Sequence, residues 1–154
     1  MYLLDTNHCS RIIDGDQNVI QALNNLGDTI VATCAIVRGE LIYMAHKSDR
    51  QAENLRLVED FLKDIDVYPI DEDAATIYGE IKIAVINRFG PQEKAKRRKI
   101  DIDKLGFKEN DLWIAAVAKQ HGLFIVSADS DFQRMKEAYD LEVTTWYRNT
   151  FVGW

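Results

Sequence analysis

The chain begins with Met1-Tyr2-Leu3-Leu4-Asp5-Thr6-Asn7, an apolar run that ends in a carboxylate, a hydroxyl and an amide. We expect Tyr2–Leu4 to form a short buried strand, because a parallel strand covered on both faces is continuously apolar. Asp5 then follows the carboxyl end of this strand, at the edge of an open α/β sheet where ligands bind. Asp5 is therefore a candidate site residue. The alternative is that Asp5, Thr6 or Asn7 only caps the next helix, since all three side chains accept bonds from free helix N–H groups.

Strands and helices alternate along the rest of the sequence. β-rich runs predict further strands over residues 29–33, 66–70, 123–127 and 141–146. Pro69 places the third strand at an edge or marks its end. Helical periodicity predicts helices over residues 10–13, 17–26, 35–46, 48–64, 72–89, 109–121 and 129–138, with Thr33 as the cap of the third. This alternation predicts an α/β fold with a central, mainly parallel five-stranded sheet and helices on both faces.

The length and composition fit a single domain over residues 1–154. A chain of this size buries roughly 68–70% of its unfolded surface, enough for a substantial core. No apolar run approaches the ~20 residues of a membrane span. A strand that begins at Met1 leaves no room for a cleaved leader. We therefore expect a cytoplasmic protein without membrane contact.

The charge is unevenly distributed. The formal net charge is −6, which argues against nucleic-acid binding through the overall field of the protein. A dense basic run nevertheless lies within residues 90–108, a long connection without clear periodicity. Its cations are Lys94, Lys96, Arg97, Arg98 and Lys99. Such a run can bind phosphates locally or can be a solvated loop without a partner, and both interpretations stay open.

Four acids lie near junctions between predicted strands and helices. Asp5 and Asp129 follow the first and fourth strands, so both project from the same edge of a parallel sheet. Glu40 lies about two turns into the helix after the second strand and can reach that edge from its flank. Asp111 lies in the first turn of the helix before the fourth strand, which we expect to start at the opposite edge. An irregular connection through residues 90–108 is one way to bring Asp111 to the others.

Each acid also has a purely structural interpretation. Asp111 can stabilise its helix through the dipole, Asp129 and Asp131 can be turn residues, and Glu40 can be a surface acid. Together, however, carboxylates at one edge repel one another unless a cation or protons neutralise them. The scattered histidines and cysteines show no zinc spacing, so hard oxygen ligands predict Mg²⁺ or Mn²⁺. Carboxylate-bound Mg²⁺ supports phosphodiester cleavage by activating water and stabilising the leaving oxygen.

Four stretches, in order along nearly the whole chain, resemble the PIN-domain ribonucleases, specifically the VapC-like toxins of bacterial toxin–antitoxin pairs. These stretches are Leu3–Asn7, Ala35–Leu41, Glu109–Ala116 and Val126–Phe132, and the final Val143–Trp146 is also similar. The resemblance implies a three-layer PIN-like sandwich and a Mg²⁺-dependent endoribonuclease. It also implies that the start of the helix carrying Asp111 reaches the catalytic edge.

The resemblance further assigns roles to individual residues. Asp5, Asp111 and Asp129 would bind the metal, and Glu40 would bind it directly or through water. Beyond the resemblance, the nuclease hypothesis gives supporting roles to Thr6, Asn7, Ser127 and Asp131. In the same hypothesis the basic run at Lys94–Lys99, which lies in a connection longer than the family's, would hold the RNA backbone. The implied partners are an RNA substrate, a cognate antitoxin that inserts a peptide into the cleft, and a second copy of the chain in a homodimer.

Two other functions compete with this interpretation. An aspartyl-phosphate phosphatase also places an Asp after its first strand, but its chemistry needs a second Asp two residues later, where Asn7 stands. A PIN-fold domain that binds RNA or a partner without cleavage predicts a broken acidic set, whereas all four acids are present here.

Overall fold

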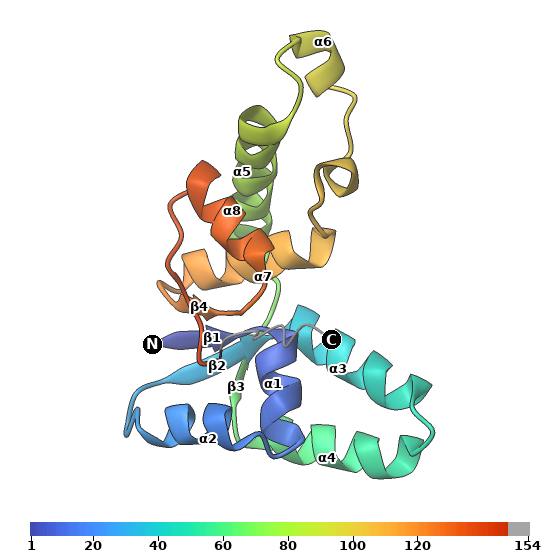
Figure 1. Cartoon of the computed structure of the whole chain (residues 1–154), viewed down its shortest axis with the longest axis vertical. Coiled ribbons are helices and arrows are strands. Elements are labelled where there is room, and N and C mark those ends of the chain that lie inside the picture. The colour runs from blue at the N-terminus through green and yellow to red at the C-terminus, as the bar shows by residue number, and fades with distance from the viewer. Residues whose placement is uncertain (148–154) are drawn as a thin grey trace, which may run out of the picture.

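A computed structural model describes residues 1–147, and its five strands form one sheet in the order β3-β2-β1-β4-β5 (Figure 1). The strands are β1 (Tyr2–Leu4), β2 (Val31–Cys34), β3 (Asp66–Tyr68), β4 (Phe124–Val126) and β5 (Val143–Thr144). Every strand pairing is parallel. β1 is the central strand, and β3 is an edge strand that ends just before Pro69, so the predicted sheet is confirmed.

Helices cover both faces of the sheet. They are α1 (Thr6–Ile13), α2 (Gln17–Asn24), α3 (Ala35–Lys47), α4 (Gln51–Lys63), α5 (Glu72–Phe89), α6 (Lys94–Arg97), α7 (Glu109–Gln120) and α8 (Ser130–Ala138), with a 3₁₀ helix η1 at Ile102–Leu105. Figure 1 shows α5, α7 and α8 on one side of the sheet and α1, α2 and α4 on the other. The molecule is thus the three-layer α/β sandwich expected from the sequence. Among residues 1–147, no helix has the length and apolar character needed to cross a membrane.

The core packs the central strands against α7 and also includes buried residues of α3, α4 and α5. Leu3 and Leu4 of β1 and Ile125 and Val126 of β4 are completely buried. Residues 114–118 of α7 are also buried, and a helix that is apolar around its circumference belongs in a core. The burial of residues 114–118 fixes the middle of α7 in the core, while residues 108–110 at its start are exposed.

Two sequence-based details near the first strands are wrong. Thr33 does not cap α3: Cys34 occupies the cap position without a side-chain bond, and the Thr33 hydroxyl instead donates to the Leu4 carbonyl oxygen at 2.9 Å. The first helix begins at Thr6 rather than four residues later, because Asp5 caps it directly after β1. The chain therefore passes from strand to helix within one residue.

The expected position of α7 is also wrong, and the reason is topological. Each strand of a parallel sheet begins at the amino edge, so a helix that leads into a strand must run back from the carboxyl edge. α7 does so before β4, and Asp111 in its first turn lines the same pocket as Asp5 and Asp129. No irregular detour is needed to bring these acids together.

The connection from Gly90 to Lys108 has an outer part that extends away from the sheet and an inner part that is anchored by Arg134. α6 lies at its outer end, away from the sheet (Figure 1). In the inner part, Phe107 is buried beneath the guanidinium of Arg134, 4.2 Å from the ring centroid. Arg134 also donates to the Leu105 carbonyl oxygen at 2.8 Å. This anchor fixes the chain just before α7.

Substitution of Gly106 tests this anchor, and substitution of Gly79 in α5 serves as a comparison. Gly106 has φ +85°, and a Cβ added there would lie 3.2 Å from Nη1 of Arg134. We expect Gly106→Ala to lower the free energy of unfolding by about 1–2 kcal/mol, because left-handed backbone is strained for alanine. Gly79→Ala, in the exposed middle of α5, is expected to raise it by about 0.5–1 kcal/mol, since alanine restricts the unfolded chain. Urea unfolding measures both, and the reverse order would contradict this account of the anchor.

Candidate metal centre

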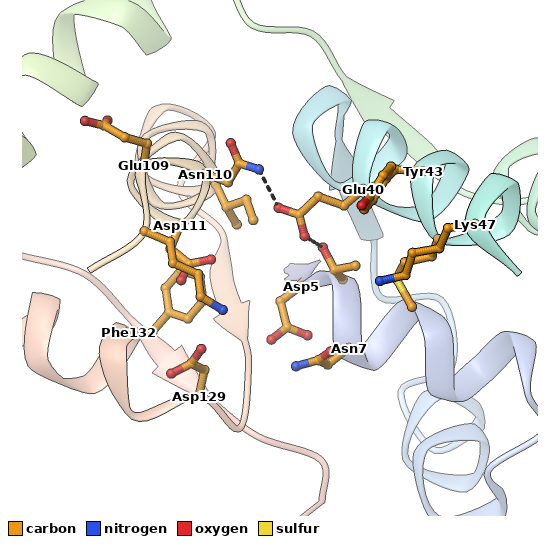
Figure 2. A pocket seen from close by; sticks show the side chains of 14 residues that line it. Asp5, Asn7, Glu40, Tyr43, Lys47, Glu109, Asn110, Asp111, Asp129 and Phe132 are labelled. Carbon is orange, nitrogen blue, oxygen red and sulfur yellow. Dashed lines mark hydrogen bonds between the residues drawn. The ribbon is translucent and has the colours of Figure 1, made fainter. Parts of the chain in front are cut away.

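A pocket of about 610 Å³ opens at the carboxyl edge of the sheet, between α3 and the start of α7. The four acids singled out in the sequence all line it: Asp5, Glu40, Asp111 and Asp129. Figure 2 shows Asp5 between the two walls, with Glu40 on α3 facing the α7 side and Asp129 below Asp111. Thr6 and Asn7 line the same pocket. Elements far apart in the sequence thus bring their acids to one place.

Three carboxylates lie closest together in this region. Asp111, Asp129 and Asp131 each offer an oxygen, and these oxygens lie within 4.8 Å of one another. Asp129 caps α8, so Asp131 follows in the first helical turn, where its carboxylate accepts from Arg134 at 3.3 Å. The sequence predicted Asp131 only as a supporting residue, whereas the fold groups it directly with Asp111 and Asp129.

Asp111 is the least satisfied of these acids. Its Oδ2 atom is buried and has no hydrogen-bond partner among residues 1–147. Burial, together with the charges of Asp129 and Glu40, raises the pKa of Asp111 to about 7, while Lys108 acts in the opposite direction. A buried carboxylate oxygen without a donor, beside two other carboxylates, fits a divalent cation with oxygen ligands.

Asp5 both caps a helix and lines the pocket. Its Oδ1 atom accepts from the backbone N–H of His8 at 2.8 Å and from the ring Nδ1 of His8 at 2.9 Å. Its Oδ2 atom accepts from the hydroxyl of Ser127, at the end of β4. The two interpretations of Asp5 are therefore not exclusive, because the cap itself holds the carboxylate at the pocket.

His8 is a site-supporting residue that the sequence analysis missed. Its side chain is completely buried, and Nε2 accepts the backbone N–H of Trp146 at 3.3 Å. The proton of a neutral His8 therefore lies on Nδ1 and is donated to Asp5. The spacing of three residues between Asp5 and His8 at a helix start was the available signal, but the contact with Trp146 was not.

Glu40 is fixed from both sides of the pocket. Oε2 accepts from the hydroxyl of Thr6 at 2.7 Å, and Oε1 accepts from the amide of Asn110 at 3.0 Å. These bonds, drawn as dashed lines in Figure 2, join α3 to α1 and α7. Thr6 thus lies where a supporting residue was predicted, while Asn110 was not singled out as one.

The first turn of α7 is clamped from α5. The ammonium of Lys82 donates to Glu109 at 2.6 Å and to the hydroxyl of Tyr78 at 3.1 Å, and that hydroxyl also bonds Glu109. The ring of Tyr78 stacks on Trp113 with a centroid distance of 3.9 Å. The clamp holds the helical turn that carries Asp111.

The basic run does not line this pocket. Lys94, Lys96 and Arg97 belong to α6, where Arg97 donates to the carbonyl oxygens of Pro91 and Gln92 within its own loop. The cations that do line the pocket are Lys47 and Lys108. RNA contact by the basic run therefore stays a prediction, separate from the acidic pocket.

Comparisons with known proteins find matches to this chain in both sequence and fold. The PIN domain family matches residues 2–138. The chain is 30% identical over 116 residues to Ribonuclease VapC5 of Mycobacterium tuberculosis, covering 73% of this chain and 74% of the relative. It is 29% identical over 135 residues to the tRNA(fMet)-specific endonuclease VapC of Shigella flexneri, covering 87% and 91%. A crystal structure of DNA-bound VapBC from Salmonella typhimurium superimposes with a TM-score of 0.73 at 25% identity, over 95% of this chain and 98% of that one.

Removing the charge of Asp111 is expected to stabilise the cation-free protein, increasingly so at higher pH. The pKa of this carboxyl is raised to about 7, so its ionisation favours the unfolded chain and stability is lost as pH rises through that value. Between pH 5 and pH 8, the advantage of Asp111→Asn over wild type should grow by on the order of 2 kcal/mol. Unfolding in EDTA measures it, with Asp49→Asn as an exposed control. An advantage that is absent, or that shrinks as pH rises, contradicts the prediction.

Proposed function

Because this chain belongs to the PIN-domain family and has VapC ribonucleases among its relatives, we propose that it is a divalent-cation-dependent endoribonuclease. Its reaction would be hydrolysis of RNA phosphodiester bonds. The observation that carries this proposal is the buried oxygen of Asp111, which has no hydrogen-bond partner among residues 1–147 and lies beside Asp129 and Asp131. Asp5 and Glu40 line the same pocket as Asp111 and Asp129.

The acids divide into two groups in this proposal. Asp111 and Asp129 were predicted as ligands from the sequence, and their carboxylates also lie close together, so they are the first choice as ligands. Asp131 is the third member of this close group of carboxylates. Asp5 and Glu40 are fixed by hydrogen bonds at the same pocket and offer further oxygens. Such hard donors suit Mg²⁺, with Mn²⁺ as a substitute. When bound, the cation would supply a water of lowered pKa and positive charge near the leaving oxygen.

The remaining residues position these acids. His8 and Ser127 hold the carboxylate of Asp5, and Thr6 and Asn110 hold that of Glu40. In this proposal Glu40 would accept a hydrogen bond from an attacking water and orient it. Donors of this kind fix ligand orientation, and their loss weakens metal affinity or activity.

Purified protein is expected to cleave RNA with Mg²⁺ or Mn²⁺ and to stop when EDTA is added. Asp111→Asn and Asp129→Asn should each reduce the rate by at least about 100-fold, because the cation supplies several kcal/mol of transition-state stabilisation. Asp49→Asn, which alters an exposed acid outside the pocket, should cleave like wild type. Cleavage in EDTA, or full activity in both pocket variants, rules the proposal out.

We further propose that the protein is the cytoplasmic toxin of a toxin–antitoxin pair, forms a homodimer, and is silenced by its antitoxin. The support is its likeness to VapC ribonucleases and to the VapC fold in VapBC complexes. Expression of the wild type alone should arrest bacterial growth, whereas Asp111→Asn at the same protein level should not. Equal arrest by both proteins would separate toxicity from the acidic pocket.

A further inference from the structure

The acid-lined pocket has a cation on each wall. Lys47 comes from the last turn of α3, and Lys108 precedes the first turn of α7. Within residues 1–147, neither lysine forms an ion pair with a carboxylate, although acids line the same pocket, whereas Lys82 is paired with Glu109 at 2.6 Å. Two unpaired ammonium groups are thus available on opposite sides of the carboxylates.

An exposed aromatic ring lies beside one of these cations. Tyr43 is 64% exposed and lines the pocket, and the Nζ of Lys47 lies 5.3 Å from its ring centroid. Glu40, Tyr43 and Lys47 follow the i, i+3, i+7 spacing of one helix face. Figure 2 shows all three on the α3 wall, so the face leads from the acids to the outer part of the pocket.

The simplest alternative is that Tyr43 is an isolated exposed apolar residue, which is normal on protein surfaces. Its location argues for more than this, because it shares one pocket with two unpaired lysines and the candidate metal ligands. A phosphodiester entering this pocket meets repulsion from the carboxylates. Cations on the walls offset that repulsion, and an aromatic ring next to them binds a base through stacking.

We propose that Tyr43, Lys47 and Lys108 form a binding site for single-stranded RNA across the acidic pocket. Tyr43 stacks on a base adjacent to the scissile phosphate, and the two ammonium groups bind phosphates on either side of it. The site requires an unpaired strand, because a base within a duplex has no free face for the ring. This inference rests on the ribonuclease function proposed above and names the substrate form that the site accepts.

The test measures binding of a fluorescein-labelled 12-nucleotide single-stranded RNA in EDTA, over a series of NaCl concentrations. Tyr43→Ala should weaken binding by about 10-fold, as expected for loss of one stacked base, while Tyr43→Phe stays near wild type. Lys47→Gln and Lys108→Gln should each reduce the slope of log affinity against log salt by about 0.7. Lys63→Gln, an exposed lysine of α4, is the control and should keep the wild-type slope. The same sequence as a duplex should bind equally to wild type and Tyr43→Ala.

Three results would overturn the inference. In the first, Tyr43→Ala binds single-stranded RNA with the affinity of Tyr43→Phe. In the second, both lysine variants keep the salt slope of the Lys63→Gln control. In the third, light scattering shows that Tyr43→Ala converts a dimer to a monomer while RNA affinity is retained, which would assign the ring to a protein interface.

Cleavage measured in parallel with Mn²⁺ separates this inference from the proposed function. If wild type does not cleave but binds RNA through Tyr43, the hydrolytic function fails and the binding site stands. If wild type cleaves, and the Tyr43→Ala, Lys47→Gln and Lys108→Gln variants cleave with its kcat/KM, the function stands and the binding site fails.

Discussion

Repulsion between carboxylates at the carboxyl edge of the sheet is the constraint on which this structure depends. Burial and the charges of Asp129 and Glu40 raise the pKa of Asp111 to about 7, so the cation-free pocket favours a proton on this residue. The fold nevertheless drives the acids together, because β1 and β4 end at this edge and the buried helix α7 begins there. The packed core supplies the stability that holds the acids in place, and the divalent cation proposed for this pocket would remove the repulsion.

The acids of the pocket differ in the hydrogen bonds that they accept. Asp5 receives donors from His8 and Ser127, and both oxygens of Glu40 are also engaged. Asp111 has a buried oxygen with no partner among the described residues. The hydrogen-bonded acids keep a fixed geometry, and Asp111 is the acid that the proposed cation would neutralise. In the proposed RNA site, the lysines of the pocket walls, which pair with no carboxylate among residues 1–147, would offset the same repulsion for a phosphate-containing substrate.

Strand direction and residue type made much of the fold and part of the site predictable from the sequence. Asp5 and Asp129 come after parallel strands, so their common edge was predictable. The prediction for the start of α7 was wrong, because a helix before a parallel strand returns from the carboxyl edge of the sheet. Long-range packing was not predictable. His8 is oriented by Trp146, which lies 138 residues later in the chain. The basic run at Lys94–Lys99 was predicted to bind RNA from its charge density alone, and it does not line the acidic pocket.

The central claim is that a divalent cation binds the acidic pocket through Asp111 and displaces the proton that burial favours there. Calorimetric titration with Mn²⁺, in two buffers of different ionisation enthalpy, measures the protons released on binding. For a carboxyl whose pKa is about 7, binding should release close to one proton at pH 6 and about a tenth of a proton at pH 8. Asp111→Asn should remove this pH-dependent release. Binding without proton release at pH 6, or the same release from Asp111→Asn, would contradict the account.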